Sequence, residues 1–466
     1  MRAESGPYPA SMVLDACQGV LLQGDASTVF DAISTDSRDI RAGDLFVPLK
    51  GTTFDGHEFV LPALEAGARG SLVDRGGNRE IPHKLTNQVL IQVQDTLRAL
   101  SDLASAYRKS YTLPLIAVTG SSGKTTVKEM IAAVLGRSHH PLVSQGNLNN
   151  MIGLPMTVLN LNGTHTVAVV EAGVNTVGEM KYLARAASPD VAVITTIGPV
   201  HLEGLGSIEQ VADEKFDLVR SVRTHGTAVV PHGNAYLKSH LGQAHCTVVS
   251  FGIEHGDFRA AKIQEADGTR FEMITASGAI EVSLSVPGRH NIANALAAAA
   301  ACVAVRVPLP EVADALRGFE PPTWRMEILA LSGGRILIRD CYNANPQSMK
   351  SALQVLSTRG SGRPRLAVLA DMMELGAYSG KLHQELGEEV ARLGIDRVVF
   401  VGEYGEQVAR GFRDAGGNSD SVQVFDDKQE AWKAIRPDIK KFGAILVKGS
   451  RVTKMETMAQ NILEEN

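Results

Sequence analysis

The strongest chemical signal in the sequence is a glycine-rich segment, Thr119-Gly120-Ser121-Ser122-Gly123-Lys124-Thr125-Thr126. It directly follows the apolar run 115–118 and precedes the helical run 127–135, and a phosphate-binding loop requires this order of strand, turn and helix. The glycines let consecutive backbone N–H groups converge on phosphate oxygens, while the helix N-terminus adds positive potential. Lys124 would supply a mobile positive charge, and Thr125 a hydroxyl ligand for Mg²⁺. We therefore expect this loop to bind the phosphates of ATP.

The loop departs from the full P-loop pattern at one position. Val118 stands where G-x-x-x-x-G-K-[ST] has its first glycine, so the match is only G-x-x-G-K-T. The alternative interpretation is an ordinary strand-to-helix turn with a solvated lysine. Because strand, turn and helix fall in register, the pattern favours phosphate binding. Such loops also occur in nucleotide-dependent switches, so the loop alone does not specify a reaction.

Two more residues follow apolar runs that we interpret as neighbouring strands, and a metal site would lie at the carboxyl ends of such strands. The run 167–170 leads straight into Glu171, whose carboxylate is a candidate metal ligand. The alternative is that Glu171 caps a nearby helix. His201 follows the strand around Ile194 after a Gly-Pro-Val turn, which places it at the same edge. Its alternative is a hydrogen-bonded structural histidine.

Lys215 lies on the apolar face of a predicted helix. Ser207, with Gln210 three residues later, has the form of a capping box, so a helix should begin there. Lys215 follows Ile208 by seven residues and shares its apolar stripe. Since a buried ammonium is costly, this lysine must snorkel to solvent, pair with an anion or lose its charge. A neutral Lys215 can react with CO₂ and give a carbamate that bridges metal ions.

These residues need a fold that brings their strands together. At 466 residues the chain is too long for one core, so roughly two to four domains are expected. From residue 113 apolar runs alternate with helical ones, which indicates a parallel sheet covered on both faces. The doublet Pro321 and Pro322 marks a second boundary. We predict an α/β fold of three domains: a mixed α/β domain over 1–112, a central parallel-sheet P-loop ATPase domain over 113–321, and a Rossmann-like domain over 322–466.

Composition excludes several classes of protein. A net charge of −5 gives no basic surface for nucleic acid or anionic lipid. The four cysteines form no C-x-x-C pair, which argues against a disulfide framework and fits a reducing cytosol. Residues 1–12 contain no apolar signal segment, and the apolar run 292–307 is too short to span a bilayer, so we interpret it as a buried helix. We expect a cytoplasmic protein with no membrane insertion and no nucleic-acid partner.

Together these residues resemble the Mur ligases, the enzymes that build the peptide stem of peptidoglycan precursors. The likeness runs nearly end to end. In the middle it rests on the T-G-S-S-G-K-T-T loop, the G-N-L-N-N segment 146–150, Glu171, His201 and Lys215. The resemblance implies that Lys215 is carbamylated and joins Glu171 and His201 around magnesium, with two Mg²⁺ sites, and that Lys124 is catalytic with these three. The substrate contacts implied in segment 146–150 are Asn147, Asn149 and Asn150.

Three further regions carry the resemblance. The segment G-R-H-N-I-A-N-A, 288–295, looks like the family's adenine-contacting helix start, which implies ATP contacts by His290, Asn291 and Asn294. Arg325 and Asp340 resemble the family's nucleotide-binding arginine and aspartate, and such groups suit phosphate and ribose. An N-terminal T-D-S-R segment looks like part of the uridine-nucleotide domain, although taken alone it shows only turn residues. Its members are Thr35, Asp36, Ser37 and Arg38.

The last third indicates the reaction within the family. Segments 340–346 (D-C-Y-N-A-N-P), 369–376 (L-A-D-M-M-E-L-G) and 446–451 (L-V-K-G-S-R) resemble the members that add D-alanyl-D-alanine to UDP-N-acetylmuramoyl-tripeptide. The D-N-P-R signature of siblings that add meso-diaminopimelate is absent. The resemblance implies a monomeric, ATP-dependent amide ligase that forms an acyl phosphate. The implied dipeptide contacts are Tyr342, Asn343, Asn345, Lys448 and Ser450.

The sequence also departs from the family pattern. Cys341 replaces a small or hydroxyl residue, and Val177 stands where proline is common. Phe216 and Asp217 follow Lys215 in place of a small residue and a glutamate. None of these changes removes a proposed catalytic group, and we treat Cys341 as non-catalytic. The rival interpretations are a sibling ligase that adds a single amino acid, a folylpolyglutamate synthase, and a P-loop switch.

Overall fold

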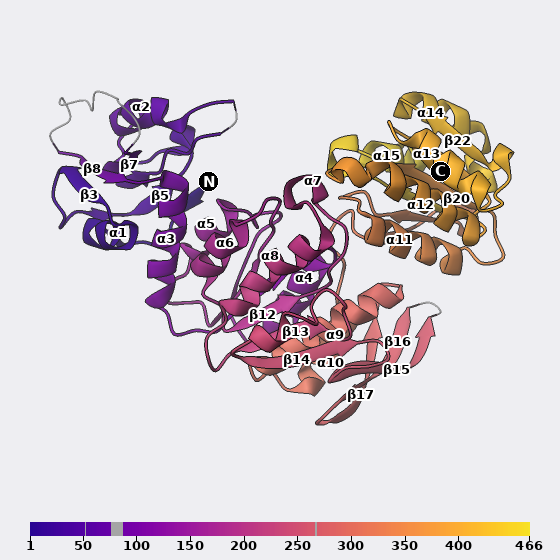
Figure 1. The fold of residues 1–466 in the computed structure, drawn as a ribbon, viewed down its shortest axis with the longest axis horizontal. Coiled ribbons are helices and arrows are strands. Elements are labelled where there is room, and N and C mark those ends of the chain that lie inside the picture. Colours follow the sequence, from indigo (N-terminus) through magenta and orange to yellow (C-terminus); the bar gives the residue numbers. More distant parts are fainter. Residues whose placement is uncertain (52, 76–86, 266–267) are drawn as a thin grey trace.

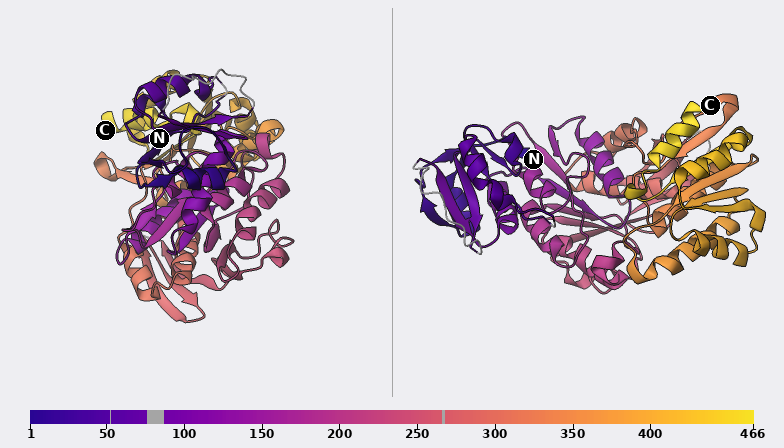
Figure 2. Two further views of the ribbon diagram at one scale, coloured as in Figure 1. Left: turned by 90° about the vertical axis from the view of Figure 1, so that its left-hand side faces the viewer. Right: turned by 90° about the horizontal axis from the view of Figure 1, so that it is seen from above.

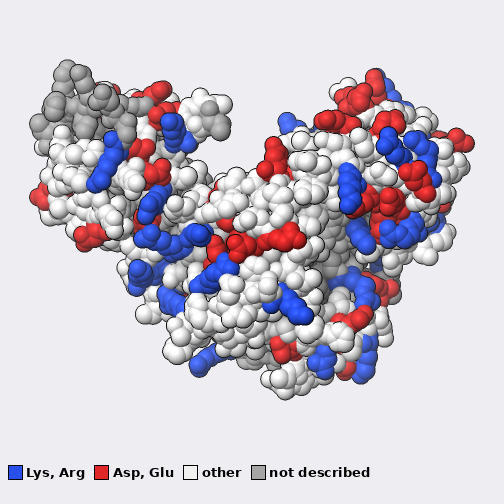
Figure 3. All heavy atoms as spheres, viewed as in Figure 1, with Lys and Arg blue, Asp and Glu red and all other residues white. Residues whose placement is uncertain are grey.

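The computed structural model describes residues 1–51, 53–75, 87–265 and 268–466, and it folds them around three large sheets (Figure 1). The three sheets belong to successive parts of the chain, and the N- and C-terminal parts stand on either side of the central part (Figure 1, Figure 2). The space-filling view shows a hollow between these two outer parts, floored by the central one (Figure 3). The predicted fold class, α/β with three domains, is confirmed.

The N-terminal domain has a mixed six-stranded sheet. In spatial order its strands are β1 (Arg2–Ala3), β5 (Ala32–Ser34), β6 (Asp44–Phe46), β7 (Gly70–Asp74), β8 (Val89–Val93) and β3 (Val20–Gln23). Strands β5 to β8 run parallel, and the edge strands β1 and β3 are antiparallel to their neighbours. A small second sheet and three α-helices complete the domain: β2 (Tyr8–Pro9), β4 (Val29–Phe30), α1 (Ala10–Cys17), α2 (Val60–Glu65) and α3 (Thr96–Lys109).

The central domain has a nine-stranded sheet. In spatial order its strands are β10 (Pro141–Val143), β11 (Val167–Glu171), β9 (Leu115–Thr119), β12 (Val191–Ile194), β13 (Thr227–Pro231), β14 (Thr247–Gly252), β15 (Phe258–Glu265), β16 (Thr269–Thr275) and β17 (Gly278–Leu284). Its helices are α4 (Lys124–Leu135), α5 (Gly153–Val158), α6 (Glu179–Ala187), α7 (Leu202–Leu205), α8 (Ile208–Arg220), α9 (Arg289–Ala304) and α10 (Leu309–Arg317).

Both faces of the parallel part of this sheet are buried, as the continuous apolar runs predict. Along β9, Leu115 and Ala117 pack on the side of α5, α6 and α8, while Ile116 and Val118 pack on the side of α4, α9 and α10. The apolar run predicted as a buried helix is α9. The parallel strands therefore end together at one edge, where the phosphate loop, Glu171 and the segment after β12 meet.

The sheet differs from the predicted all-parallel one at its far end. Strand β15 pairs parallel with β14, but β16 pairs antiparallel with β15 on one side and with β17 on the other. The alternation of buried Phe271 and Met273 with the more exposed Arg270 and Glu272 along β16 is the period-2 pattern of such strands. Sequence reasoning that searched for apolar runs followed by helices passed over this signal.

The C-terminal domain has a six-stranded sheet in the order β18 (Glu327–Ala330), β19 (Ile336–Arg339), β23 (Ala444–Lys448), β20 (Arg365–Ala370), β21 (Arg397–Val401) and β22 (Val422–Phe425). All neighbours pair parallel except β18 with β19. The helices on its two faces are α11 (Pro346–Arg359), α12 (Ser379–Arg392), α13 (Gly405–Asp414), α14 (Lys428–Ile435) and α15 (Glu456–Glu464). Short 3₁₀ turns connect elements throughout the chain: Ser37–Asp39, Gly56–Phe59, Leu241–Gln243, Ser332–Gly334, Gly376–Tyr378, Ser419–Ser421, Arg436–Lys441 and Arg451–Thr453.

The two junctions between domains differ in kind. One continuous apolar core runs from the N-terminal domain into the central domain, and it includes Tyr8 and Leu100 on one side and Leu154 and Met180 on the other. The C-terminal domain has two cores of its own, and its contacts with the phosphate loop region are polar. We infer that the N-terminal pair of domains forms one body against which the C-terminal domain can move.

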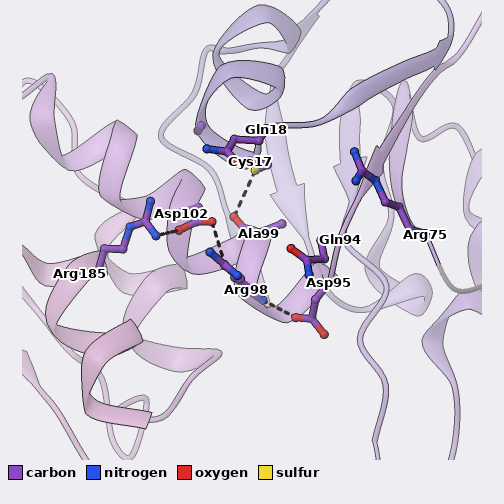
Figure 4. A pocket seen from close by; sticks show the side chains of 10 residues that line it. Cys17, Gln18, Arg75, Gln94, Asp95, Arg98, Ala99, Asp102 and Arg185 are labelled. Atoms are coloured by element: carbon purple, nitrogen blue, oxygen red, sulfur yellow. Dashed lines mark hydrogen bonds and ion pairs between the residues drawn. The ribbon is translucent and has the colours of Figure 1, made fainter. Parts of the chain in front are cut away.

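A small polar cavity of about 90 Å³ lies at the first junction, beside α1, α3 and α6 (Figure 4). Its wall contains an ion pair between Arg185 of α6 and the nearly buried Asp102 of α3, with Nη1 and Oδ1 2.8 Å apart. Burial raises the pKa of the Asp102 carboxyl, and the positive charge of Arg185 opposes that rise. The pair thus connects the two domains beside their shared core.

Arg108 holds the same junction from the interior. Its guanidinium is fully buried and donates to the carbonyls of Tyr111 and Leu113, each at 2.8 Å, and to Asp190 Oδ2 at 3.0 Å. Replacing Arg108 by methionine leaves the two buried carbonyls without this donor and takes one partner from Asp190, which keeps Leu115 N and Arg223, so we expect the free energy of unfolding to fall by about 3 kcal/mol. Urea unfolding measures this loss, and the exposed neighbour Lys109→Met is the matched control. Equal urea midpoints for the two variants would contradict the assignment.

Of the helices in the described ranges, none has the length and apolarity that crossing a bilayer requires.

Candidate functional site

The glycine-rich loop connects β9 to α4 and is held in shape by the end of β12. Gly120 and Gly123 both have positive φ, 146° and 82°, and a Cβ at Gly120 would overlap the side chain of Thr195. Ser121 donates its backbone N–H to Thr196 O at 2.8 Å and its hydroxyl to Gly198 O at 3.0 Å. The loop is therefore preorganised as a cradle of backbone N–H groups at the N-terminus of a helix.

Lys124 and Thr125 begin helix α4 in this cradle. The Lys124 ammonium donates to the Gly120 carbonyl at 2.8 Å, which folds the side chain over the loop. Burial lowers the pKa of Lys124; Glu171 opposes this shift, and Arg325 adds to it. Arg325 belongs to the C-terminal domain, so positive groups from two domains approach the same loop. This is the arrangement that a triphosphate needs.

Glu171, the last residue of β11, lies beside the loop with 2 % of its surface exposed. Its Oε2 accepts from the Thr125 hydroxyl at 2.7 Å, and its Oε1 accepts from Asn149 Nδ2 at 2.7 Å. Both donors are side chains, so the carboxylate does not act as a cap on a helix end. A carboxylate and a hydroxyl on neighbouring elements are hard oxygen ligands of the kind that Mg²⁺ takes.

Lys215 lies in α8, which begins at the predicted place: the Ser207 side chain accepts from Gln210 N, although the second bond of a capping box is not formed, because Ser207 N donates to Leu205 O. Only 1 % of Lys215 is exposed, so its side chain does not snorkel to solvent. Burial lowers its pKa well below the usual range; Lys124 lowers it further, while Glu214 and Glu171 oppose the shift. Glu214 is itself engaged, because its carboxylate accepts from two backbone N–H groups at the start of α6.

His201 comes directly before the short helix α7, in a left-handed conformation with φ 50°. Its Nδ1 is hydrogen-bonded to Oε2 of Glu374, a residue of the C-terminal domain. This bond lowers the pKa of the Glu374 carboxyl. Within the described ranges, no group of three or more His, Cys, Asp or Glu side chains makes a cation site alone. The oxygens of a bound phosphate would have to complete one, as is usual for Mg²⁺.

The C-terminal domain contributes a second set of polar groups. The Arg325 guanidinium lies 4.0 Å from the ring centre of Tyr342. Lys448, with 1 % exposed, pairs with Asp340 Oδ2 at 2.6 Å and donates to Asn343 O at 2.9 Å. These contacts fix the backbone around 340–343 at the carboxyl ends of β19 and β23.

Two polar contacts join this set to the phosphate loop. Asn345 donates from Nδ2 to the carbonyl of Ser121 at 3.1 Å, and its own Oδ1 caps α11 by accepting from Ser348 N. Gln347 and Thr196 are hydrogen-bonded at 3.0 Å. The N-cap residue of α11 is thus hydrogen-bonded to the P-loop, so a shift of α11 would move or break a contact of that loop.

The two sets face each other across a cleft of about 640 Å³. Most of the predicted site residues line it: Ser121, Ser122, Gly123, Lys124, Thr125, Thr126, Asn147, Asn149, Asn150, Glu171, His201, His290, Asn291, Asn294, Arg325, Asp340, Tyr342, Asn343, Asn345 and Lys448. Gly120 belongs to the loop itself, and neither it nor Lys215 lines the cleft. Ser450 is buried and does not line the cleft. Its hydroxyl accepts a hydrogen bond from Met373 N at 2.9 Å.

The four predicted residues of the N-terminal domain lie away from this cleft, at the end of β5. Asp36 accepts from the Arg38 backbone at 3.0 Å and pairs with its guanidinium at 2.7 Å, and Arg38 holds the pKa of Asp36 far below its usual range. The Thr35 backbone donates to Met1 O at 3.0 Å. Ser37 opens the 3₁₀ turn Ser37–Asp39. In this turn Arg38 is exposed while Thr35, Asp36 and Ser37 are half-buried, and the structure does not bring the turn to the phosphate loop.

Several residues of the cleft were missed. Thr195 and Thr196 follow β12 directly, and the rule that ligands gather at carboxyl ends of parallel strands would have found them. Gln347 lies one residue beyond the predicted D-C-Y-N-A-N-P segment. Glu374 does not line the cleft but contacts His201, which does, and it lies inside a segment to which no role was given. Their partners are 151 and 173 residues away in sequence, and no local pattern announces such contacts.

The family departures have plain positions. Cys341 is fully buried in a core of the C-terminal domain, and burial raises the pKa of its thiol to about 12, so it stays protonated at neutral pH. Phe216 is buried under the Arg220 guanidinium. Val177 is exposed in the loop before α6. None of these side chains lines the described cleft.

Comparison with known proteins gives a consistent result. Three family descriptions match successive parts of the chain: "Mur ligase family, catalytic domain" over 29–108, "Mur ligase middle domain" over 118–302, and "Mur ligase, glutamate ligase domain" over 324–451. The Escherichia coli protein named UDP-N-acetylmuramoyl-tripeptide–D-alanyl-D-alanine ligase is 37 % identical over 98 % of both chains.

Solved structures agree. A crystal structure of MurF from Acinetobacter baumannii superposes with a TM-score of 0.90 at 33 % identity, and covers 99 % of this chain and 100 % of the other. A MurF ligase from Thermotoga maritima in complex with ADP has a TM-score of 0.81 at 26 % identity, covering 93 % and 97 %. The loop, the cleft, the three matched family descriptions and the 37 % identity over nearly the whole chain support one conclusion. This chain belongs to the Mur ligase family.

Proposed function

We propose that the chain is the ATP-dependent ligase that joins D-alanyl-D-alanine to UDP-N-acetylmuramoyl-tripeptide, with release of ADP and phosphate. The observation that carries the proposal is the cleft in which the P-loop faces Arg325, Asp340 and Lys448 of another domain. Two relatives that bear this name are each 37 % identical to the chain over nearly its whole length, which supports the choice of substrates. The cleft belongs to a single chain, and we propose that the enzyme acts as a cytoplasmic monomer.

The reaction must first activate a carboxylate, whose oxygen is otherwise too poor a leaving group. The terminal carboxylate of the tripeptide attacks the γ-phosphorus of ATP; a P–O bond forms, the bond to ADP breaks, and an acyl phosphate results. The amine of the dipeptide then attacks the acyl carbon, the amide bond forms, and phosphate leaves with the electrons of the C–O bond. The amine loses one proton. Catalysis of the first step is mainly positioning and charge neutralisation.

The residues at the loop suit that task. The backbone N–H groups from Ser122 to Thr126 would hold the phosphates, because the Ser121 N–H is already donated to Thr196 O. The Lys124 ammonium, bonded to Gly120 O, would contact the γ-phosphate. Two anions, the carboxylate and the phosphate, must approach. At about 4 Å and an effective dielectric of 20 they repel by about 4 kcal/mol, which the positive groups of the cleft have to offset.

We propose two Mg²⁺ sites at this edge. Thr125 and Glu171, already 2.7 Å apart, would hold one ion, and His201 with Lys215 as its carbamate would hold the other. Bound Mg²⁺ supplies charge neutralisation of the phosphate oxygens. The carbamate forms when the neutral Lys215 amine bonds to the carbon of CO₂ and releases one proton. The depressed pKa of Lys215 supports this step, because only the unprotonated amine reacts.

The remaining assignments rest on the resemblance to the family and, for the residues that line the cleft, also on their position there. His290, Asn291 and Asn294 at the start of α9 would contact the adenine, and Asn147, Asn149 and Asn150 the incoming substrate. Tyr342, Asn343, Asn345 and Lys448 would shape the dipeptide site, with Ser450 behind them. The turn from Thr35 to Arg38 would contact the uridine nucleotide.

Phosphate release tests the proposal. With ATP, Mg²⁺ and UDP-N-acetylmuramoyl-tripeptide, we expect release to require D-alanyl-D-alanine and to stay at background with D-alanine, L-lysine, meso-diaminopimelate or glutamate as the amine. The assay is run with tripeptides that end in lysine and in meso-diaminopimelate, and mass spectrometry identifies the pentapeptide. Turnover with a single amino acid would show a sibling ligase or a folylpolyglutamate synthase. ATP hydrolysis that ignores every amine would show a switch.

A further inference from the structure

His201 and Glu374 meet across the boundary between the central and C-terminal domains in an unusual way. Neither is glycine, yet both occupy the left-handed region, with φ 50° and 64°. Their side chains are hydrogen-bonded through His201 Nδ1 and Glu374 Oε2, and Glu374 O also accepts from Glu203 N at 3.2 Å. Uncommon backbone conformations gather at functional sites, and here they lie on both sides of one contact between domains.

The loop that carries Glu374, residues 371–376, is fixed by its own domain. The Asp371 carboxylate accepts from Glu403 N at 2.9 Å and from Tyr404 N at 3.2 Å. Met372 N donates to Nε2 of the fully buried His383 at 2.9 Å, and Met373 N donates to Ser450 Oγ at 2.9 Å. Anchored at three successive positions, the loop presents Glu374 as a preset group.

His201 is equally fixed from the central side. It caps α7, and its carbonyl accepts from Leu205 N at 2.8 Å. Helix α7 lies tightly on the loop that follows Glu171, because a Cβ at Gly204 would overlap the carbonyl of Asn175. The imidazole thus lines the cleft on the strand edge that carries Glu171, with the carboxylate of another domain behind it.

Stability alone does not account for the contact. The Glu374 side chain is 52 % exposed, and an ion pair that open to water contributes little to folding. An imidazole that binds a cation through one nitrogen commonly donates its other N–H to a carboxylate, which fixes the tautomer and the ring orientation. With Nδ1–H given to Glu374, the lone pair of His201 remains on Nε2.

We propose that Glu374 is a positioning residue for a divalent cation that His201 holds through Nε2. Because Glu374 belongs to the C-terminal domain, the cation site is complete only when that domain is docked on the central one. Docking of the domain that carries Arg325 and Lys448 therefore also prepares the imidazole of His201. The inference rests on the proposed function for its cation and nucleotide, but it concerns a residue to which no role was assigned above.

Cation binding without turnover tests this role. Mn²⁺ serves as the probe in place of Mg²⁺, with a non-hydrolysable imido analogue of ATP, and free Mn²⁺ is measured by electron paramagnetic resonance. We expect Glu374→Ala to weaken the weaker of two Mn²⁺ sites by about 10- to 100-fold. Glu374→Gln, which still accepts from Nδ1–H but lacks the charge, should weaken it less. Glu203→Gln removes an exposed carboxylate two residues from His201 and should change nothing.

A second readout reports the imidazole directly. In protein labelled with ¹⁵N-histidine, with the His201 signal identified by its loss in His201→Gln, we expect the Nδ1–H tautomer in the parent chain and in Glu374→Gln. In Glu374→Ala the two tautomers should mix. A fixed tautomer in Glu374→Ala together with unchanged Mn²⁺ binding would overturn the inference.

These outcomes are separable from those of the proposed function, since neither readout contains a muramyl peptide or a dipeptide. A chain that fails to make pentapeptide but loses Mn²⁺ affinity on Glu374→Ala would refute the ligase assignment alone. A chain that makes pentapeptide and binds Mn²⁺ equally in both forms would refute the role of Glu374 alone. A thermal melt of each variant shows that it is folded.

Discussion

Replacing Lys124 by methionine is expected to lower the turnover number by roughly 100- to 1,000-fold, the usual cost of one preorganised group that stabilises transition-state charge. The ammonium of Lys124 lies over the loop, bonded to Gly120 O, and no other lysine reaches the phosphates from helix α4: Lys128, one turn further, is fully buried and donates to Ser144 O. Methionine keeps the length and the apolar stem and removes only the charge. Pentapeptide formation under saturating ATP measures the effect.

Because the expected effect of Lys124→Met comes from the lost positive charge, the controls keep that charge or remove one elsewhere. Lys124→Arg keeps the charge but spreads it over a larger planar group, so we expect an intermediate loss. Lys181→Met, on the exposed face of α6, removes a charge from the same domain and should leave turnover unchanged. If Lys124→Met raised only KM for ATP and left the turnover number intact, the lysine would serve ground-state binding, and its assigned role in phosphoryl transfer would be wrong.

A site residue could be predicted from the sequence when the pattern that marks it lies within one short stretch of the chain. The P-loop could be predicted because glycine spacing, lysine, threonine and the flanking strand and helix are contiguous. Lys215 could be predicted to be buried because a helical stripe needs only seven residues to show it, and the structure places it at 1 % exposure. Each inference required only one contiguous stretch of sequence and no knowledge of the fold.

The rest required the relative positions of elements. The bonds of Glu374 to His201, Gln347 to Thr196 and Asn345 to Ser121 each join the C-terminal domain to the central one, and domain packing decides them. The turn containing Asp36 shows the opposite limit. Only resemblance to a family suggested that it binds a nucleotide, and in the structure it is a half-buried turn in which Asp36 pairs with the exposed Arg38.

Lys215→Ala is expected to lower turnover by about 100-fold or more, equal to about 3 kcal/mol of transition-state stabilisation, and a short carboxylic acid should restore part of it. The physical reason is that the side chain cannot reach solvent, so a charged ammonium there would be buried. The Lys215 side chain is 1 % exposed, its pKa is held well below the usual range by burial, and the positive Lys124 acts on it in the same sense. A neutral amine there reacts with CO₂, and the product is an anion that the nearby positive Lys124 stabilises.

Removing the side chain as far as Cβ leaves space into which acetate or propionate can bring a carboxylate, so rescue should depend on the chain length of the acid. Lys215→Arg provides the matched control, because its guanidinium stays charged and forms no carbamate; acetate should not rescue it. Labelled bicarbonate should give a ¹³C signal in the parent chain that Lys215→Ala lacks. Full activity of Lys215→Ala without added acid would rule out the carbamate. A loss of activity that no carboxylic acid restores would indicate that Lys215 has only a packing role. Rescue by acetate but not by a neutral amide of the same size would show that the site needs the negative charge, since the two molecules fill the same space.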